Sequence, residues 1–247
     1  MDKTNNTSAL KPERLKSACA NCGVLELCLP LGLNGDEINR LDNLIVQRIK
    51  VKKGAMLFRQ GYPLSALYAV RLGFFKTTMV TEEGREQITG FQMIGEMLGM
   101  DAIGDEHYTC NAIALEDSEV CPLHFAHLEQ LSHDLPSLQH NLNKLMSNEI
   151  IRDHTLLLMM GNMNSDERLG AFLLNLSQRL ALRGYSPYSF VLRMRREEIA
   201  SYLGMRLETI CRSIARLREL CLVNISARNV DILDLPGLKH LVAGCDR

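Results

Sequence analysis

The sequence predicts an α+β protein with an N-terminal Cys-rich loop, an antiparallel β-roll, a long helix and a C-terminal winged helix-turn-helix. Three observations predict this fold. Short runs of β-branched and aromatic residues alternate with glycines from 45 to 121, the glycines then vanish while the apolar period lengthens, and an alternating strand pair follows several short helices. The expected boundaries are 1–30, 31–133, 134–163 and 164–247.

Composition is that of a folded globular protein. Of the 247 residues, 46% are hydrophobic and 23% are charged, which excludes a disordered or low-complexity chain. The longest apolar run, Leu156 to Met160, is far shorter than the ~20 residues of a membrane helix, and the N-terminus lacks a signal-peptide core. We therefore expect a cytoplasmic protein with no membrane partner.

The N-terminal loop carries Cys19, Cys22 and Cys28, three of eight cysteines. A compartment that keeps thiols reduced makes structural disulfides improbable, so the clustering indicates a metal. Three thiolates leave one position to a further ligand. The candidates are Cys110, Cys121, Cys211, Cys221 and Cys245.

Cys121 is the favoured fourth ligand, and Cys110 is its main competitor. Cys121 precedes Pro122, as ferredoxin ligands do, and is expected to end a strand, whereas Cys110 begins the run CNAIAL. Zinc competes with iron-sulfur because C-x2-C serves both metals, although structural zinc usually has two close ligand pairs. The three-plus-one spacing favours iron-sulfur.

The β-roll is predicted from runs at 45–51, 66–73, 74–80 and 86–91, separated by glycine turns. A long helix is predicted from about 134 to 162, with an apolar seam typical of a dimer. Asp153 interrupts this seam, and paired like charges there would weaken association. The expected dimer interface is Leu142, Met146, Ile150, Asp153, Leu157 and Met160.

The C-terminal part has the spacing of a helix-turn-helix at 197–215, with Gly204 at the turn, where a side chain would obstruct. Two alternating runs around 227–229 predict a hairpin wing. Residues 165–247 carry 13 basic against 9 acidic residues, and seven arginines lie within 191–218. An ordinary helical hairpin with a solvated face explains neither the arginines nor the wing, so we expect DNA binding. Ser213 fits poorly, since it falls where the recognition helix usually faces inward.

The order of these motifs resembles the fumarate and nitrate reduction regulators (FNR) of the cyclic AMP receptor protein superfamily (CRP/FNR), over essentially the whole chain. The specific matches are LMSNEI at 145–150 with Asp153, ERLGAFLLNLSQR at 167–179, RGYSP at 183–187, and the E-x-x-x-R of Glu208 and Arg212. The resemblance implies a cyclic-nucleotide-binding-like jelly roll as the sensory domain, and a winged helix that binds DNA.

The resemblance further implies a [4Fe-4S] cluster on Cys19, Cys22, Cys28 and Cys121, which oxygen converts to a [2Fe-2S] form that no longer supports the DNA-binding dimer. It assigns dimer tuning to Ile150 and Asp153. It also implies double-stranded DNA with an inverted repeat resembling TTGAT-N4-ATCAA, a homodimer and RNA polymerase as partners. Two departures are Gly23, where relatives often have a polar residue, and Cys211, where they commonly have serine.

The expected base contacts are Glu208, Cys211 and Arg212, which share one helix face at i, i+3 and i+4. Arg195 and Arg216 are expected on the DNA backbone. A cyclic nucleotide is not expected, because Gly95-Glu96 is followed by 106–109, EHYT, without the arginine that would grip a cyclic phosphate.

Two alternative functions differ in the role of the metal. An iron-sulfur redox enzyme or electron carrier would need a substrate site, but the seven histidines are scattered and no phosphate loop or carboxylate pair stands out, so we expect no enzyme. A DNA-binding regulator with a structural zinc would be colourless, whereas an iron-sulfur protein is brown.

Overall fold

A computed structural model describes residues 19–23, 25–45 and 47–244 of the chain. The start of the predicted N-terminal segment and Cys245 lie outside these residues. The described chain confirms the predicted fold class: an antiparallel β-roll, a long helix and a C-terminal winged helix-turn-helix, preceded by the cysteine segment. No helix in these residues is long and apolar enough to cross a membrane.

The β-roll consists of two four-stranded antiparallel sheets, in the orders β1-β8-β3-β6 and β2-β7-β4-β5. Glycine-rich turns join short strands, so the chain folds back repeatedly and encloses an apolar interior that contains Phe75 and Val120. The strands are β1 (Ile49–Val51), β2 (Met56–Phe58), β3 (Ala66–Leu72), β4 (Phe74–Val80), β5 (Glu86–Met93), β6 (Met97–Leu98), β7 (Asn111–Ala114) and β8 (Ser118–His124).

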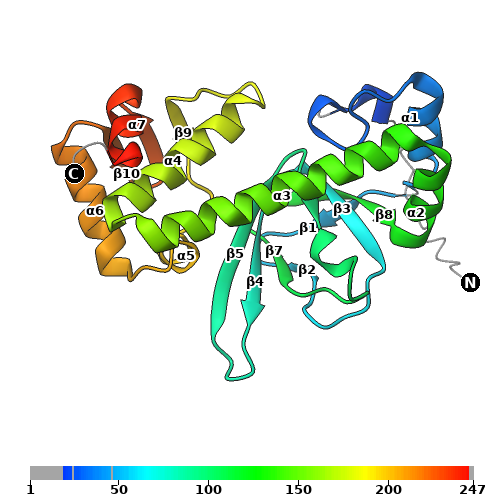
Figure 1. Cartoon of the computed structure of the whole chain (residues 1–247), viewed down its shortest axis with the longest axis horizontal. Coiled ribbons are helices and arrows are strands. Elements are labelled where there is room, and N and C mark those ends of the chain that lie inside the picture. The colour runs from blue at the N-terminus through cyan, green and yellow to red at the C-terminus, as the bar shows by residue number, and fades with distance from the viewer. Residues whose placement is uncertain (1–18, 24, 46, 245–247) are drawn as a thin grey trace, which may run out of the picture.

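The long helix α3 (Pro136–Asn162) runs across the molecule (Figure 1). Pro136 occupies its first turn, where the missing N–H costs nothing, and the helix is preceded by α2 (Phe125–Asp134). The N-terminal half of α3 packs with α2 and α1 (Gly35–Asp42) over the outer face of β3 and β8. Its C-terminal end reaches the winged-helix domain, so one element touches both ends of the protein.

The C-terminal domain contains α4 (Ser165–Ala181), α5 (Arg196–Tyr202), α6 (Leu207–Glu219) and α7 (Leu235–Ala243), with a three-stranded sheet of β9 (Ser189–Val191), β10 (Val223–Ser226) and β11 (Asn229–Ile232). Gly204 has φ +63° at the turn between α5 and α6, a conformation that favours glycine. Ser226 pairs with Asn229, so the wing is a tight hairpin.

The β-roll and the winged-helix domain share one hydrophobic core. Phe91 of β5 packs against Phe172 of α4 and Tyr202 of α5, with ring centroids 6.2 and 5.1 Å away. At the edge of this contact, Lys76 Nζ lies 3.0 Å from Glu198 Oε1, and the Ser201 hydroxyl accepts the Ile88 N–H at 3.1 Å. The winged-helix domain is therefore packed directly on the β-roll.

Candidate functional site

The cysteine segment winds in turns of three residues. Two 3₁₀ turns, η1 (Cys19–Asn21) and η2 (Leu25–Leu27), lie in a run of i to i+3 hydrogen bonds that begins with Cys22 N–H to Cys19 carbonyl and continues through Leu25 and Cys28. Three residues per turn return positions 19, 22, 25 and 28 to the same side. The C-x2-C-x5-C spacing thus aligns its three thiols on one face.

Cys121 joins these thiols from a different part of the chain. It lies on β8, paired with Ala69 of β3, and lines one cavity together with Cys19, Cys22 and Cys28. Apolar residues of the cysteine segment, α1, β3 and β8 form most of the remaining wall, and Arg71 is its charged member. Four thiols that are up to 102 positions apart in sequence therefore surround a single, mainly apolar space.

Cys110 is buried in a different core. It packs inside the roll with Val120, whereas its competitor Cys121 belongs to the outer core beneath α1 and α2. Because successive side chains of a strand point to opposite faces, Val120 and Cys121 mark the two sides of β8. One reason for favouring Cys121 was wrong: it lies inside β8 (Ser118–His124), and Cys110 just precedes β7 (Asn111–Ala114).

The thiols affect one another electrostatically. Burial raises the pKa of Cys28 to about 12, partly offset by the Leu29 N–H, and Cys121 and Cys22 raise it further. Burial also raises the pKa of Cys19 and of Cys121 above the usual range. A metal that binds here must displace protons, because thiolates are the ligands. No three His, Cys, Asp or Glu side chains of the described residues form a ready coordination sphere.

One residue of the cavity lining has a buried polar atom without a partner among the described residues. Arg71 lines the cavity, and its buried Nε has no hydrogen-bond partner within the described part of the chain. Its Nη1 donates to Glu119 at 2.9 Å, so the guanidinium is anchored on one side only. A buried donor without an acceptor is unusual in proteins. Four thiols and a free donor fit the chemistry of an anionic thiolate-ligated metal group.

The recognition helix α6 exposes the three residues that were expected to read bases. Glu208, Cys211 and Arg212 are all solvent-exposed, and an N–H of Arg196 approaches Cys211 Sγ at 3.9 Å. The inward face of α6 holds Ile210 and Ser213. Ser213 does face inward, as its position suggested: it is 1% exposed, and its hydroxyl has no partner among the described residues.

The two arginines expected on the DNA backbone are exposed as well. Arg195 forms the N-cap of α5, and its side chain lies 3.7 Å from Glu198 Oε1. Arg216 lies one turn beyond Arg212 on α6, 3.5 Å from Glu219 Oε2. Both guanidiniums are more than half exposed and remain accessible to phosphates.

The predicted dimer seam divides into two parts in the structure. Leu142 is buried within the protomer, beneath α1 and α2, so the first residue of the predicted seam is already covered by its own chain. Met146 is half-buried, and the seam residues that follow it are not covered by the rest of the protomer. The exposed members of the seam are Ile150, Asp153, Leu157 and Met160. Burial raises the pKa of Asp153, although Arg152 and His154 oppose that change.

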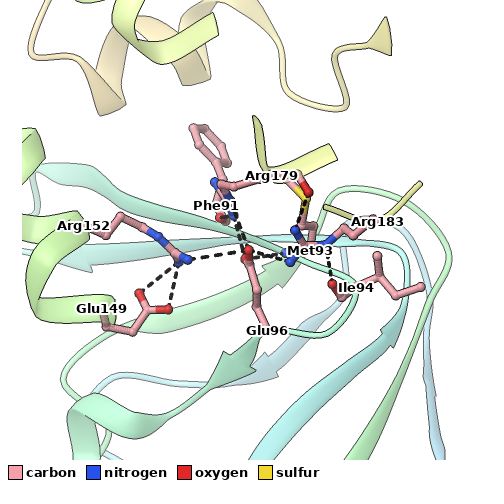
Figure 2. Close-up of polar contacts among 8 residues, drawn as sticks. All are labelled: Phe91, Met93, Ile94, Glu96, Glu149, Arg152, Arg179 and Arg183. Atoms are coloured by element: carbon pink, nitrogen blue, oxygen red, sulfur yellow. Dashed lines mark hydrogen bonds and ion pairs between the residues drawn. The ribbon is translucent and has the colours of Figure 1, made fainter. Parts of the chain in front are cut away.

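An ion cluster that the sequence did not reveal joins the two domains (Figure 2). Glu96, in the turn between β5 and β6, is 8% exposed. It accepts hydrogen bonds from Arg179 at 2.6 and 3.0 Å and from Arg183 at 2.8 Å, and Arg152 of α3 lies 3.5 Å away. Arg152 in turn binds both oxygens of Glu149, at 2.8 and 3.0 Å.

Together, the β-roll, the exposed recognition helix and its wing define a DNA-binding transcription regulator. Family comparisons agree: residues 48–134 match the cyclic nucleotide-binding domain, and 167–241 match the Crp-like helix-turn-helix domain. The chain belongs to the CRP/FNR family of transcription regulators.

The similar proteins cover nearly the whole chain. The transcriptional regulatory protein btr of Bordetella pertussis is 45% identical over 91% of this chain and 93% of its own length. The fumarate and nitrate reduction regulatory protein of Escherichia coli is 41% identical over 90% of this chain and 89% of its own. FixK2 from Bradyrhizobium japonicum, 23% identical, shares the fold with a TM-score of 0.73 over 79% of this chain and 96% of its own.

Proposed function

We propose that this regulator senses oxygen through a [4Fe-4S] cluster held by Cys19, Cys22, Cys28 and Cys121. The observation that carries the proposal is the single cavity lined by these four thiols. When bound, the cluster supplies iron and sulfide that react with oxygen and convert to a [2Fe-2S] form. The resemblance of the chain to anaerobic and fumarate and nitrate reduction regulators supports this assignment.

Arg71 supports an anionic metal group in the cavity. A cluster with four thiolate ligands carries net negative charge, and its sulfur atoms accept hydrogen bonds. The unpartnered Nε of Arg71 and its positive charge meet both requirements. A structural zinc with four thiolates is also anionic, so the donor set alone leaves zinc as the competitor.

The protein's own residues connect the cavity to the dimer helix. The Asn141 side-chain amide of α3 donates to the carbonyls of Leu29 at 3.0 Å and Leu31 at 2.7 Å, just after Cys28. Without a metal that joins them, the thiols are held by apolar packing, by turn hydrogen bonds and by Asp42, which accepts the Cys19 N–H at 2.6 Å. The segment then loosens, α3 shifts, and repulsion between the two Asp153 carboxylates separates the protomers.

A cyclic nucleotide is not part of the proposal, although the β-roll belongs to that domain family. Both Glu96 oxygens are engaged by arginines of this chain. Residues 106–109 supply a positive-φ turn but no arginine. In the proposed function, the homodimer binds an inverted repeat that resembles TTGAT-N4-ATCAA and acts on RNA polymerase in the cytoplasm.

The test is anaerobic purification with iron, sulfide and zinc assays and absorbance spectra before and after air. We expect brown protein with about four irons per chain, a changed visible spectrum with loss of iron in air, and a parallel loss of DNA binding. Cys121→Ala should lose the iron, and the matched control Cys110→Ala should retain it. Colourless protein that contains zinc, or Cys121→Ala with full iron, would overturn the assignment.

A further inference from the structure

The turn after β5 is the place where three parts of the molecule meet. Glu96 lies in this turn, and its Oε2 accepts the Met93 N–H at 3.0 Å, so the carboxylate is fixed to its own backbone. The same carboxylate binds Arg152 from α3 and two arginines from the C-terminal domain (Figure 2). One buried side chain thus links the β-roll, the long helix and α4.

The arginines also bind the backbone of the same turn. Arg179 donates from Nη2 to the Phe91 carbonyl at 2.5 Å, and Arg183 donates from Nε to the Ile94 carbonyl at 2.6 Å. Their side chains are only 13% and 6% exposed. A guanidinium that binds carboxylate and carbonyl at once has a fixed orientation, which a lysine ammonium would not provide. The end of α4 is therefore held rigidly on the turn.

The cysteine segment touches the turn from the other side. Gly95 has φ +86°, and a Cβ at this position would lie 2.8 Å from Leu27 Cβ, so the leucine packs directly on the backbone of the turn. Leu27 is the neighbour of Cys28. Both residues line a cavity of about 460 Å³ that Glu96, Arg152 and Arg183 also line. A displacement of the cysteine segment must therefore change the packing against Gly95.

We propose that Leu27, Gly95 and Glu96 form a coupling joint that transmits the state of the cysteine segment to the DNA-binding domain within one protomer. The joint acts in addition to the dimer helix. Its input rests on the proposed function, because the metal at the thiols determines where Leu27 sits. Its output is the position of α4, which the two arginines attach to the turn.

The charge balance makes the joint cooperative. The cluster contains three arginines against the carboxylates of Glu96 and Glu149, all largely removed from water. Burial raises the pKa of Glu96, but Arg179, Arg152 and Arg183 lower it overall below its usual range, so the group stays charged. Removal of Glu96 leaves buried guanidiniums uncompensated, so the contacts form or break together.

Hydrogen exchange read by mass spectrometry tests the input. In the parent protein, removal of iron should raise amide exchange at the end of α4, residues 177–184, by about tenfold. In Leu27→Ala, amide exchange in residues 177–184 should be the same with and without iron, and the iron content should be unchanged. Leu33→Ala, a change in the same segment at a residue that lines neither this cavity nor the thiol cavity, should behave like the parent. Unchanged exchange in the parent after iron loss would overturn the coupling.

The output is tested without any dependence on iron. Glu96→Gln should raise exchange in 177–184 and around Arg152 by about tenfold, whereas Glu86→Gln, an exposed change on β5, should not. If Glu96→Gln fails to fold, Arg183→Lys, which keeps the charge, should raise exchange in 177–184. If the faster amide exchange in these variants is confined to the turn itself, the joint is refuted. If the parent protein purified without air contains no iron, only the proposed function is refuted.

Discussion

Ser213 is the clearest case of a buried polar atom that the fold leaves without a partner. Its hydroxyl lies under α6, whereas Ser177, equally buried, donates to the Pro187 carbonyl at 2.6 Å. Ser213→Ala should raise the free energy of unfolding by about 1 kcal/mol, because a desolvated hydroxyl is removed. Ser177→Ala should lower it by about 1–3 kcal/mol, because it leaves a buried carbonyl unpaired.

Chemical denaturation of the two variants beside the parent measures both effects. Equal destabilisation by the two substitutions would show that the Ser213 hydroxyl has a partner in solution. DNA binding by Ser213→Ala should stay unchanged, since the exposed face of α6 keeps all its side chains.

The cysteine positions show how far residue patterns can predict a site. The spacing 19, 22, 28 identified one ligand face because local turns obey a three-residue period. The choice between Cys110 and Cys121 could not be derived in that way, because it depends on which core each thiol enters: Cys110 packs inside the roll and Cys121 on the outer face of β8. Arg71 gave no signal in the sequence, since a lone arginine in a strand has no distinguishing pattern.

The long helix α3 carries the prediction about oxygen and the dimer. Asp153 is exposed in line with Ile150 and Leu157, two exposed apolar residues. Asp153→Ala should remove repulsion between facing carboxylates and leave a protein that is dimeric and binds DNA in air. Sedimentation in air measures the change. A purely monomeric Asp153→Ala protein would remove this mechanism, and His154→Ala, an exposed neighbouring change, is the control.

The recognition helix α6 carries the prediction about sequence readout. Arg212 is exposed near the N-terminal part of the helix, where it can donate two hydrogen bonds to guanine O6 and N7. Arg212→Ala should weaken binding to the inverted repeat by about 1–3 kcal/mol and relax preference at one base pair. Arg216→Ala, one turn further along, should weaken all sequences alike.

Anaerobic titration against the repeat and its G-substituted variants distinguishes these outcomes. An unchanged rank order of sites for Arg212→Ala would assign this residue to a phosphate. Half-sites separated by other than about one helical turn should bind poorly, because a two-fold dimer presents its two helices ~34 Å apart.

Elements with a strong period were easier to predict than elements without one. The helix expected at 134–162 is α3, and the wing around 227–229 is β10 and β11. The sequence analysis missed α1 and α2, which are short and lie in stretches without a clear repeat. The strand expected at 45–51 is reduced to Ile49–Val51, because only these residues pair with β8.

The shared core predicts how the whole molecule unfolds. Because Phe91 packs against both Phe172 and Tyr202, the β-roll and the winged-helix domain should unfold in one transition. Phe91→Ala should cost about 3–5 kcal/mol and split that transition, with the C-terminal domain melting first. Scanning calorimetry checks this expectation. The control Phe58→Ala, inside the roll beside Tyr108, should destabilise the protein without splitting its unfolding transition. Two transitions in the parent protein would contradict the prediction.

The packing between domains could not be predicted from the sequence. Phe91 belongs to a run that predicts a strand, and Arg179 belongs to a run that predicts a helix, but neither pattern indicates that the two touch. Hydrophobic periodicity identifies which face of an element is buried and not which partner buries it. The contacts of Glu96 with arginines 56 to 87 positions away could not be predicted for the same reason, because the sequence pattern does not identify the partner of a buried residue.

The length of α3 gives it the properties of a lever. Its 27 residues span about 40 Å, and Asn141 anchors it near one end to the backbone beside Cys28. At the far end, the Met160 methyl sits at the glycine turn between α5 and α6. A rotation of only a few degrees about the anchored end therefore moves the tip by a few ångströms. In the proposed function, a small movement at the thiols is thereby enlarged at the recognition helix.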